Sequence, residues 1–509
     1  MHRFILALAL SFLAAPMAHA ACPAGAIVVR PGSSIQAAVN AAPVGSKFCI
    51  GAGQHREQSV VPTAGMQFYG EPGADMIGSR VLTGWTVEGA RWFTSGPAGT
   101  PPTTNIQECA AGFPQCNVAL AVYFDTVPLL RATSKANINS GSFWRDASNG
   151  RIYIGKNPAG HTVEVTTTEH AFSGNASNIL IKDLGVLRYG ARLQRAAIFS
   201  ANGTGWVVDG ARVIGSYGVG VDVGSKATIR NSTISGQGEM GIGCGGTGNV
   251  IADNKITDNG YWAGLDPAWE GGGLKCTEVY GTFTISAGQT NGTGLTISGN
   301  TITGNRSVGA WIDEGRDSAA PNDGIVIRNN TISGNDSAGI SVEISRGPVK
   351  VIDNVLANNG VKSGWFWGGC LQAYDSENVE AYGNTCDVTA GYGAGMMVIS
   401  QGGREVNACR NNFHNNRIIL RGPTSVTGAT GNNLSAFCSA NGNRFDHNTY
   451  YVATAAELTR ARWAWQDDEM SWAAFRSTSR QEANGTTTAG IPGTLPPITP
   501  PVCGSVVCP

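Results

Sequence analysis

The sequence predicts an all-β protein: a right-handed parallel β-helix solenoid with an N-terminal capping helix and an inserted β-rich subdomain. The main observation is a repeat of the form N-x-[IL]-x-x-N, whose copies begin 46, 30 and 24 residues apart and span 254–259, 300–305, 330–335 and 354–359. Self-similarity at a period of roughly 20 to 50 residues is typical of repeat architectures. Short β-branched runs between Gly, Asn and Ser turns predict strands rather than helices. Parallel crossovers are almost always right-handed, which gives the hand of the solenoid.

Two further features support stacked coils. The chain has 70 glycines in 509 residues without a collagen period, which suits a fold made of many tight turns. Asparagines at equivalent turns of stacked coils can hydrogen-bond to the asparagines above and below them. We therefore expect the repeated asparagines to be structural.

The elements follow in order along the chain. Residues 21–81 are expected to form the N-terminal cap and first coils, with a short capping helix within 31–42 that starts at a serine. Residues 82–165 interrupt the repeat with aromatic, strand-like runs and predict the inserted β-rich subdomain. The β-helix then occupies 166–482, closed by a helix-prone, Trp-rich cap at 458–475. Residues 483–509 form a Pro/Thr/Gly-rich tail, expected to be a linker or a poorly ordered terminus.

The N-terminus and the cysteines indicate export. Residues 1–20 have the positive start, the apolar run and the small-x-small cleavage site of a signal peptide. All 12 cysteines follow it, as expected for disulfides in an oxidising compartment. Close pairs that could form bridges are Cys109 and Cys116, Cys409 and Cys438, and Cys503 and Cys508, although order alone leaves the pairing open. We expect a secreted protein, periplasmic or extracellular, that is a monomer.

Composition narrows the partners. The formal net charge is −1, only 14% of residues are charged, and no basic run occurs, which argues against nucleic acid. No stretch beyond the signal peptide reaches the roughly 20 apolar residues that a membrane span needs. No metal-ligand spacing or phosphate-binding loop stands out. We therefore expect no cofactor, with calcium as the exception discussed below.

Four segments share an offset that predicts a column of outward side chains. In 271–275, 309–313, 339–343 and 368–372, a glycine is followed four residues later by Lys275, Asp313, Glu343 and Gln372. Side chains alternate across a strand, so Ile312 and Val342 would point inward while the polar residues point outward. The same offset adds Asp222 and Gly245, and glycines at 243 and 245 predict a hollow at one end of the column.

Some segments resemble a known family. Residues 31–40 and 150–160 resemble the entry segment of secreted right-handed parallel β-helix proteins that act on polysaccharides. Residues 269–275, 309–313 and 339–345 look like a subgroup of such exported bacterial proteins, and the similarity covers roughly 25–482. An aromatic β-sandwich inserted near the start is also seen in β-helix glycosidases of the xylosidase type, which draw an Asp nucleophile and a Glu acid from neighbouring coils. The resemblance to these is architectural. The Asn-Thr-Asp and Gly-His-Gly motifs of pectinases and the Asp-Pro-His-Asp motif of alginate epimerases are missing.

The predicted column suggests glycosidic bond cleavage. Strands of adjacent coils lie about 4.8 Å apart, so Asp313 and Glu343 should lie about 5 Å from each other. Retaining glycosidases separate their two carboxyl groups by about 5–5.5 Å. Lys275 would keep Asp313 ionised as the nucleophile and leave the proton on Glu343, the general acid/base. The substrate-binding residues would be Trp269 and Trp311, with Trp262, Trp365 or Trp367 as further stacking faces, and Gln372 and Glu270 as partners of sugar hydroxyls.

Three alternatives stay open. The column could be a solvated ladder of surface charges that contributes little. A polysaccharide lyase could use Lys275 as its base, with Asp313, Glu343 and Glu270 on calcium and with Arg316 and Arg346 on a uronate. A non-catalytic surface protein could bind glycan without cleaving it. The lyase would leave an unsaturated product that absorbs in the ultraviolet, and the binder would show no turnover.

Overall fold

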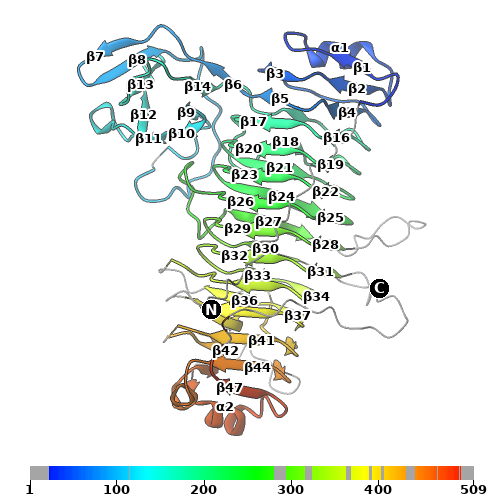
Figure 1. Cartoon of the computed structure of the whole chain (residues 1–509), viewed down its shortest axis with the longest axis vertical. Coiled ribbons are helices and arrows are strands. Elements are labelled where there is room, and N and C mark those ends of the chain that lie inside the picture. Colours follow the sequence, from blue (N-terminus) through cyan, green and yellow to red (C-terminus); the bar gives the residue numbers. More distant parts are fainter. Residues whose placement is uncertain are drawn as a thin grey trace, which may run out of the picture.

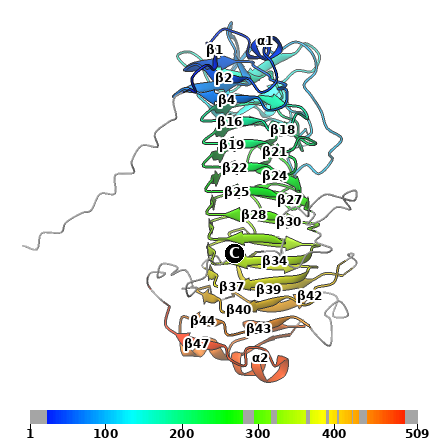
Figure 2. The same cartoon turned by 90° about the vertical axis from the view of Figure 1, so that its right-hand side faces the viewer.

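The computed structural model describes residues 22–493, apart from 114, 280–293, 316–323, 363–367, 389–392, 403–405, 423, 432–441, 467 and 492. Its coils are stacked along one long axis, with helix α1 (Ile35–Ala41) at one end and helix α2 (Trp472–Ser479) at the other (Figure 1). Three long sheets run the length of the stack, and almost every strand pairs in parallel with the equivalent strand of the next coil. The view turned by 90° shows these strands one below another along the axis (Figure 2). The predicted fold class is confirmed.

The three sheets, here named A, B and C, form the walls of the solenoid. Sheet A consists of β1 (Ile27–Val29), β2 (Lys47–Ile50), β4 (Gln67–Gly70), β16 (Leu180–Lys182), β19 (Val207–Asp209), β22 (Thr228–Arg230), β25 (Asn249–Ala252), β28 (Leu295–Ser298), β31 (Ile325–Arg328), β34 (Arg346–Ile352), β37 (Glu377–Tyr382), β40 (Asn412–His414) and β43 (Arg444–Asp446). Sheet B consists of β3 (Gly53–Arg56), β5 (Ala74–Ile77), β17 (Gly185–Leu187), β20 (Arg212–Ile214), β23 (Thr233–Ser235), β26 (Lys255–Thr257), β29 (Thr301–Thr303), β32 (Thr331–Ser333), β35 (Val355–Ala357), β38 (Thr385–Val388), β41 (Arg417–Leu420), β44 (Thr449–Val452) and β47 (Thr486–Ala489). Sheet C, which carries the candidate site, consists of β15 (Phe172–Ser173), β18 (Ala196–Ser200), β21 (Val219–Val223), β24 (Met240–Gly246), β27 (Gly272–Val279), β30 (Ala310–Asp313), β33 (Ile340–Glu343), β36 (Gly369–Tyr374), β39 (Ala394–Ser400), β42 (Thr427–Gly431), β45 (Trp463–Trp465) and β46 (Asp468–Met470).

The repeat motif forms the inner face of sheet B and the turns that flank it. Its central residues, Ile256, Ile302, Ile332 and Leu356, are register partners on β26, β29, β32 and β35, and all are fully buried. Each coil therefore buries a branched side chain against the coil above and below it. Burying one such side chain contributes about 1.5–3 kcal/mol, so the stack of coils, and not any single coil, makes the core.

The two asparagines of the motif form two ladders, which confirms their predicted structural role. In one ladder the backbone N–H and the side-chain amide of Asn254 donate to Asn300 Oδ1 at 2.9 and 3.0 Å. The same pattern continues through Asn330, Asn354, Asn384, Asn416 and Asn448. The second ladder runs through Asn259, Asn305, Asn335 and Asn359. Both ladders give hydrogen-bond acceptors to buried backbone N–H groups at the turns. Leaving such groups without a partner would cost free energy.

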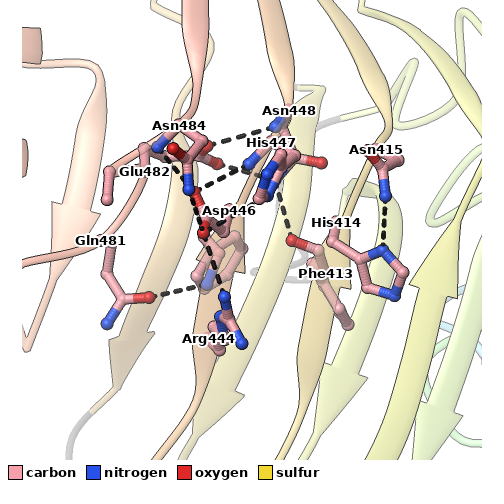
Figure 3. Close-up of polar contacts among 12 residues, drawn as sticks. Phe413, His414, Asn415, Arg444, Asp446, His447, Asn448, Gln481, Glu482 and Asn484 are labelled. Carbon is pink, nitrogen blue, oxygen red and sulfur yellow. Dashed lines mark hydrogen bonds and ion pairs between the residues drawn. The ribbon is translucent and has the colours of Figure 1, made fainter.

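The first ladder ends on a carboxylate at the C-terminal end (Figure 3). Asn448 Nδ2 and its backbone N–H donate to Glu482 at 2.7 and 3.2 Å, and the Tyr450 hydroxyl donates to the same side chain at 2.8 Å. Burial raises the pKa of Glu482, although these donors act in the opposite direction. Glu482 thus supplies the acceptor that a further asparagine would have given.

Both ends of the stack are capped. Helix α1 (Ile35–Ala41) covers the N-terminal end, and the Ser34 hydroxyl accepts a hydrogen bond from the Ala37 N–H as its N-cap. At the other end, residues predicted to be one helix-prone cap form η3 (Ala455–Thr459), β45, β46 and helix α2 (Trp472–Ser479). The expectation of a linker or poorly ordered terminus at 483–509 is wrong for its first part, because β47 at 486–489 pairs with β44 and adds the last strand of sheet B. Residues 494–509 lie outside the described residues.

Residues 79–166 contribute two small sheets beside the first coils (Figure 1). The four-stranded sheet contains β6 (Ser79–Val81), β9 (Val122–Phe124), β10 (Val127–Pro128) and β14 (Val163–Thr166); the five-stranded sheet contains β7 (Thr86–Glu88), β8 (Arg91–Ser95), β11 (Leu130–Arg131), β12 (Ser142–Arg145) and β13 (Arg151–Ile154), with η1 (Lys135–Asn137) between β11 and β12. Buried Glu164 ties them to the solenoid, because Arg56 pairs with its Oε1 at 2.6 Å and Arg188 with its Oε2 at 2.5 Å.

Disulfides link neighbouring parts of the chain. The described residues include the pairs Cys22–Cys49, Cys109–Cys116, Cys244–Cys276 and Cys370–Cys386. The predicted bridge between Cys109 and Cys116 is therefore confirmed. Cys438, Cys503 and Cys508 lie outside the described residues, as does the predicted signal peptide. Within the described part of the chain, no helix has the length and apolar character needed to cross a membrane.

Candidate functional site

The outward face of sheet C carries two adjacent columns of side chains. One column contains Thr277, Asp313, Glu343 and Tyr374, and the other contains Asp222, Gly243, Lys275, Trp311, Ser341 and Gln372. Asp313 and Glu343 are direct partners on β30 and β33. The prediction of one column is wrong for Lys275 and Gln372, since Lys275 is opposite Trp311 and Gln372 is opposite Ser341. It is also wrong for Asp222, which shares the column of Lys275 through Gly243.

The error has a physical cause. Register pairs Leu274 with Ala310, so the third glycine of the run 271–273, and not the first, corresponds to Gly309. A one-residue shift would move Lys275 to the other face of the sheet, but a two-residue shift keeps its face. Alternation therefore predicted the outward direction of Lys275 and could not place it along the strand.

Lys275 nevertheless joins the two columns. Its ammonium lies 3.1 Å from Asp313 Oδ2 and 3.2 Å from Glu270 Oε1, and it sits 4.0 Å from the centre of the Trp311 ring. Burial lowers the pKa of Lys275, but the carboxylates of Glu270 and Asp313 outweigh it and leave the pKa raised. The lysine is therefore a fixed cation between two carboxylates.

Trp311 is held inside this cluster. It is 4% exposed and packs against Val308 and Ala338, and its indole Nε1 donates to Glu343 Oε2 at 2.8 Å. The expected open face for sugar stacking is absent here, because the ammonium of Lys275 lies over the ring. Trp311 instead orients the Glu343 carboxyl group.

The two oxygens of Asp313 differ. Oδ2 receives the ion pair from Lys275, while Oδ1 is buried and has no hydrogen-bond partner in the described part of the chain. An unpartnered buried carboxylate oxygen costs free energy, and in native proteins such groups are often kept for a functional reason.

A cavity of about 450 Å³ lies beside Lys275, over β18, β21, β24 and β27. Gly243 and Gly245 line it, so the hollow predicted from these two glycines is confirmed. Its polar lining includes Gln194, Arg195, Asp222, Glu270 and Lys275. Burial raises the pKa of Asp222 to about 6, although Arg195 acts in the opposite direction. Burial also raises the pKa of Glu270, against the effect of Lys275.

A further carboxyl group, Glu239, was missed by the sequence analysis. It is fully buried just before β24, where the backbone N–H and side-chain amide of Gln194 donate to its oxygens at 2.8 and 2.9 Å. Burial, with Glu270 nearby, raises the pKa of Glu239 to about 8. No sequence motif indicates a role for Glu239, because its hydrogen-bond partners come from other coils.

The remaining predicted residues are spread around this centre. Trp269 is 38% exposed, next to Glu270 in the chain, whereas Trp262 is buried against Tyr123 and Tyr217. The Gln372 amide donates to Ser341 Oγ at 3.1 Å. Arg346 is the first residue of β34 and therefore lies on sheet A, and not on sheet C with Asp313 and Glu343. Arg316, Trp365 and Trp367 lie outside the described residues.

The carboxylates do not form an open cation site at this point. Glu270 and Asp313, two of the three acids expected on calcium, are bridged by the Lys275 ammonium. A divalent cation between them would have to displace that ammonium. The cluster of Cys22, Cys49 and Glu71 has the proximity of a metal site, but its two cysteines form a disulfide.

The stacked coils form a solenoid that carries a cluster of charged side chains on the outer face of sheet C. Comparison with known proteins shows the family to which such a chain belongs. The chain belongs to the right-handed β-helix family, whose model "Right handed beta helix region" matches residues 196–385 and 289–460. No curated protein matches the chain.

Several solved structures are similar to this chain at low sequence identity. A complex of XylC with xylose is 13% identical, with 90% of this chain and 83% of that chain covered and a TM-score of 0.58. The A-module of the Azotobacter vinelandii mannuronan C-5 epimerase AlgE6 is 11% identical, with coverages of 90% and 95% and a TM-score of 0.44. The catalytic domain of a GH87 α-1,3-glucanase bound to tetrasaccharides is 11% identical, with coverages of 81% and 96% and a TM-score of 0.35. At 13% identity the likeness to the XylC structure shows the fold alone, and no argument is drawn from the two structures whose TM-scores are 0.44 and 0.35.

Proposed function

We propose that this protein is an exported carbohydrate-active enzyme that cleaves glycosidic bonds by the retaining mechanism. The observation that carries the proposal is the direct pairing of Asp313 with Glu343 on adjacent strands of sheet C. Adjacent strands are about 4.8 Å apart, and a pair of carboxyl groups about 5–5.5 Å apart suits a nucleophile and an acid/base rather than a pair that holds a water between them.

The surroundings assign the two roles. Lys275 neutralises Asp313, so Asp313 is the carboxylate that attacks the anomeric carbon. The glycosidic C–O bond breaks as Glu343 gives its proton to the leaving oxygen. Glu343 then takes a proton from water, whose oxygen displaces Asp313 from the sugar carbon and restores both groups. Trp311 holds Glu343 in place throughout.

Two observations support a sugar substrate outside the cytoplasm. Among the described residues, four disulfides fit an oxidising compartment. The XylC structure, with a TM-score of 0.58, is described as a complex with xylose, which fits a sugar ligand for this fold. We propose that the protein acts as a monomer and without a cofactor.

The lyase alternative has less support. A base must give up its proton before it can take one from the substrate. Lys275 is instead kept protonated by two carboxylates within 3.2 Å. The same ammonium occupies the position that calcium would take between Glu270 and Asp313.

The test is turnover on a panel of plant, algal and bacterial polysaccharides, with and without a chelator. We expect new reducing ends and no product that absorbs in the ultraviolet. In Asp313→Asn and Glu343→Gln we expect the rate of turnover to fall by at least about 1,000-fold, the order of magnitude for removing a group that acts directly in catalysis. Glu380→Gln, the same change on sheet A, is the matched control. Normal rates in either site variant would refute the assignment, and glycan binding without any turnover would favour the non-catalytic alternative.

A further inference from the structure

The cavity beside Lys275 is a feature that the proposed bond cleavage does not explain. It extends over four strands, from Phe199 on β18 to Lys275 on β27, while Asp313 and Glu343 lie on the two strands that follow. The cavity and the carboxyl pair therefore share one face of sheet C. A chain-like ligand lying along the solenoid axis would touch both.

The floor of the cavity exists because two side chains are missing. Neither Gly243 nor Gly245 has a positive φ, so the backbone does not require glycine at either position. A Cβ at Gly243 would lie 3.2 Å from Asp222 Cγ, and one at Gly245 would lie 3.2 Å from the Thr277 carbonyl oxygen. These glycines provide space, and at Gly243 that space uncovers the Asp222 carboxylate.

The polar groups around this space suit a ligand rich in hydroxyls. No hydrogen bond joins the Asp222 carboxylate to another described residue; it is affected by burial, by the charge of Arg195 and by the neighbouring carboxyl group of Glu239. Glu270 lines the same cavity and already carries its ion pair with Lys275. The lining holds two carboxylates, Asp222 and Glu270, and two cations, Arg195 and Lys275, so its formal charge sums to zero. An uncharged sugar keeps that sum and can both donate to the carboxylates and accept from the cations, whereas a uronate would add a negative charge in a partly buried site.

We infer that this cavity is a sugar-binding subsite of the enzyme, that it takes uncharged sugar units of an oligosaccharide, and that Asp222 binds their hydroxyls. The inference rests on the proposed function and adds the substrate class and the direction of the bound chain. Three strand spacings separate Asp222 from Trp311, which is about 14 Å. A substrate that fills the cavity and reaches Asp313 is therefore longer than one sugar ring.

Binding is measured with the full-length mature chain carrying Asp313→Asn, so that no probe is consumed. The probes are hexasaccharides of xylose, glucose, mannose and galacturonate, and a hexamer of glucosamine. At least one neutral hexamer should bind by calorimetry, and Gly243→Val should weaken it at least tenfold. Asp222→Asn, which keeps the side-chain shape, should weaken it severalfold. Gly141→Val, at an exposed glycine of the inserted sheets without a positive φ, should leave binding unchanged.

The outcomes separate the two proposals. The subsite is refuted if no probe binds, if the galacturonate or glucosamine hexamer binds as well as the neutral hexamers, or if both the Gly243 and Asp222 variants bind normally. If the Asp222 and Gly243 variants lose binding while Asp313→Asn and Glu343→Gln still turn substrate over, the sugar-binding subsite is supported and the catalytic roles of Asp313 and Glu343 are refuted. In the wild-type background we also expect KM to decrease with oligosaccharide length, and Gly243→Val to abolish that dependence.

Discussion

The ammonium of Lys275 lies 3.1 Å from Asp313 Oδ2 even though the two residues are not register partners. Lys275 is opposite Trp311, and its side chain crosses to the neighbouring column to reach Asp313 while it also pairs with Glu270. One buried cation therefore bridges two carboxylates that come from different parts of the chain.

Lys275→Met should leave two carboxylates without their counter-ion. Removing one member of a buried ion pair typically costs about 3–5 kcal/mol, so we expect the free energy of unfolding to fall by about that amount in guanidinium titrations. Activity should fall as well, because Asp313 loses its neutralising charge. Lys350→Met, at an exposed position of sheet A, is the control and should change the free energy of unfolding by less than about 0.5 kcal/mol. Equal effects of the two substitutions would contradict the buried ion pairs of Lys275 with Glu270 and Asp313.

Trp311→Phe tests whether the indole positions Glu343. Phenylalanine keeps an aromatic ring under the Lys275 ammonium but removes the Nε1 donor. A hydrogen bond to a charged group is worth about 1.5–3 kcal/mol, so kcat should fall roughly tenfold to a hundredfold with little change in KM. Trp85→Phe loses an indole hydrogen bond to the Leu82 carbonyl, outside the solenoid sheets, and should leave kcat unchanged. A rise in KM with normal kcat would instead mean that Trp311 contacts substrate.

Glu239 should make the stability depend on pH. Its pKa is raised to about 8 in the folded protein, so its protonated form is favoured there, whereas the unfolded chain ionises it near its ordinary value of 4.5. The stabilisation is fully present below about pH 4.5 and is lost as the pH rises towards 8, because the unfolded state binds fewer protons over that range. The slope attributable to this residue is about 1.4 kcal/mol per pH unit between these two values.

Glu239→Gln cannot ionise and should remove that slope. Chemical denaturation at several pH values between 5 and 8 measures it, and the free energy of unfolding of the variant should fall less steeply than that of the wild type. Glu380→Gln, at a partly exposed glutamate, should keep the wild-type slope. Parallel slopes for Glu239→Gln and the wild type would show that Glu239 is ionised in the folded protein.

Asn305→Ala should show what one rung of a ladder contributes. Asn305 Oδ1 accepts from the backbone and side chain of Asn259 at 3.1 and 2.8 Å, and its amide donates to Asn335 Oδ1 at 2.9 Å. Each buried group left without a partner costs about 1–3 kcal/mol, so the melting temperature should fall by several degrees. Asn105→Ala, at an exposed position, should not change it. A loss no larger than that of this control would mean that water replaces the missing amide.

Part of the site could be predicted because the relevant pattern is local. Alternation along 309–313 and 339–343 placed Ile312 and Val342 inside and Asp313 and Glu343 outside, and the burial and register agree. Gly243 and Gly245 predicted a hollow for the same reason, since an outward position without a side chain leaves space.

The sequence by itself determined the class of fold and the inner and outer faces of its strands, because the repeat copies the same hydrogen-bonding and burial pattern into every coil. Only the tertiary structure decided which outward residues meet. The run of glycines at 271–273 allows a two-residue shift that preserves the alternation, so the position of Lys275 depended on pairing with β30. Glu239 and Gln194 are 45 residues apart and meet only when the coils stack. Contacts between coils depend on how far each turn carries the chain, and that length varies along this sequence from coil to coil.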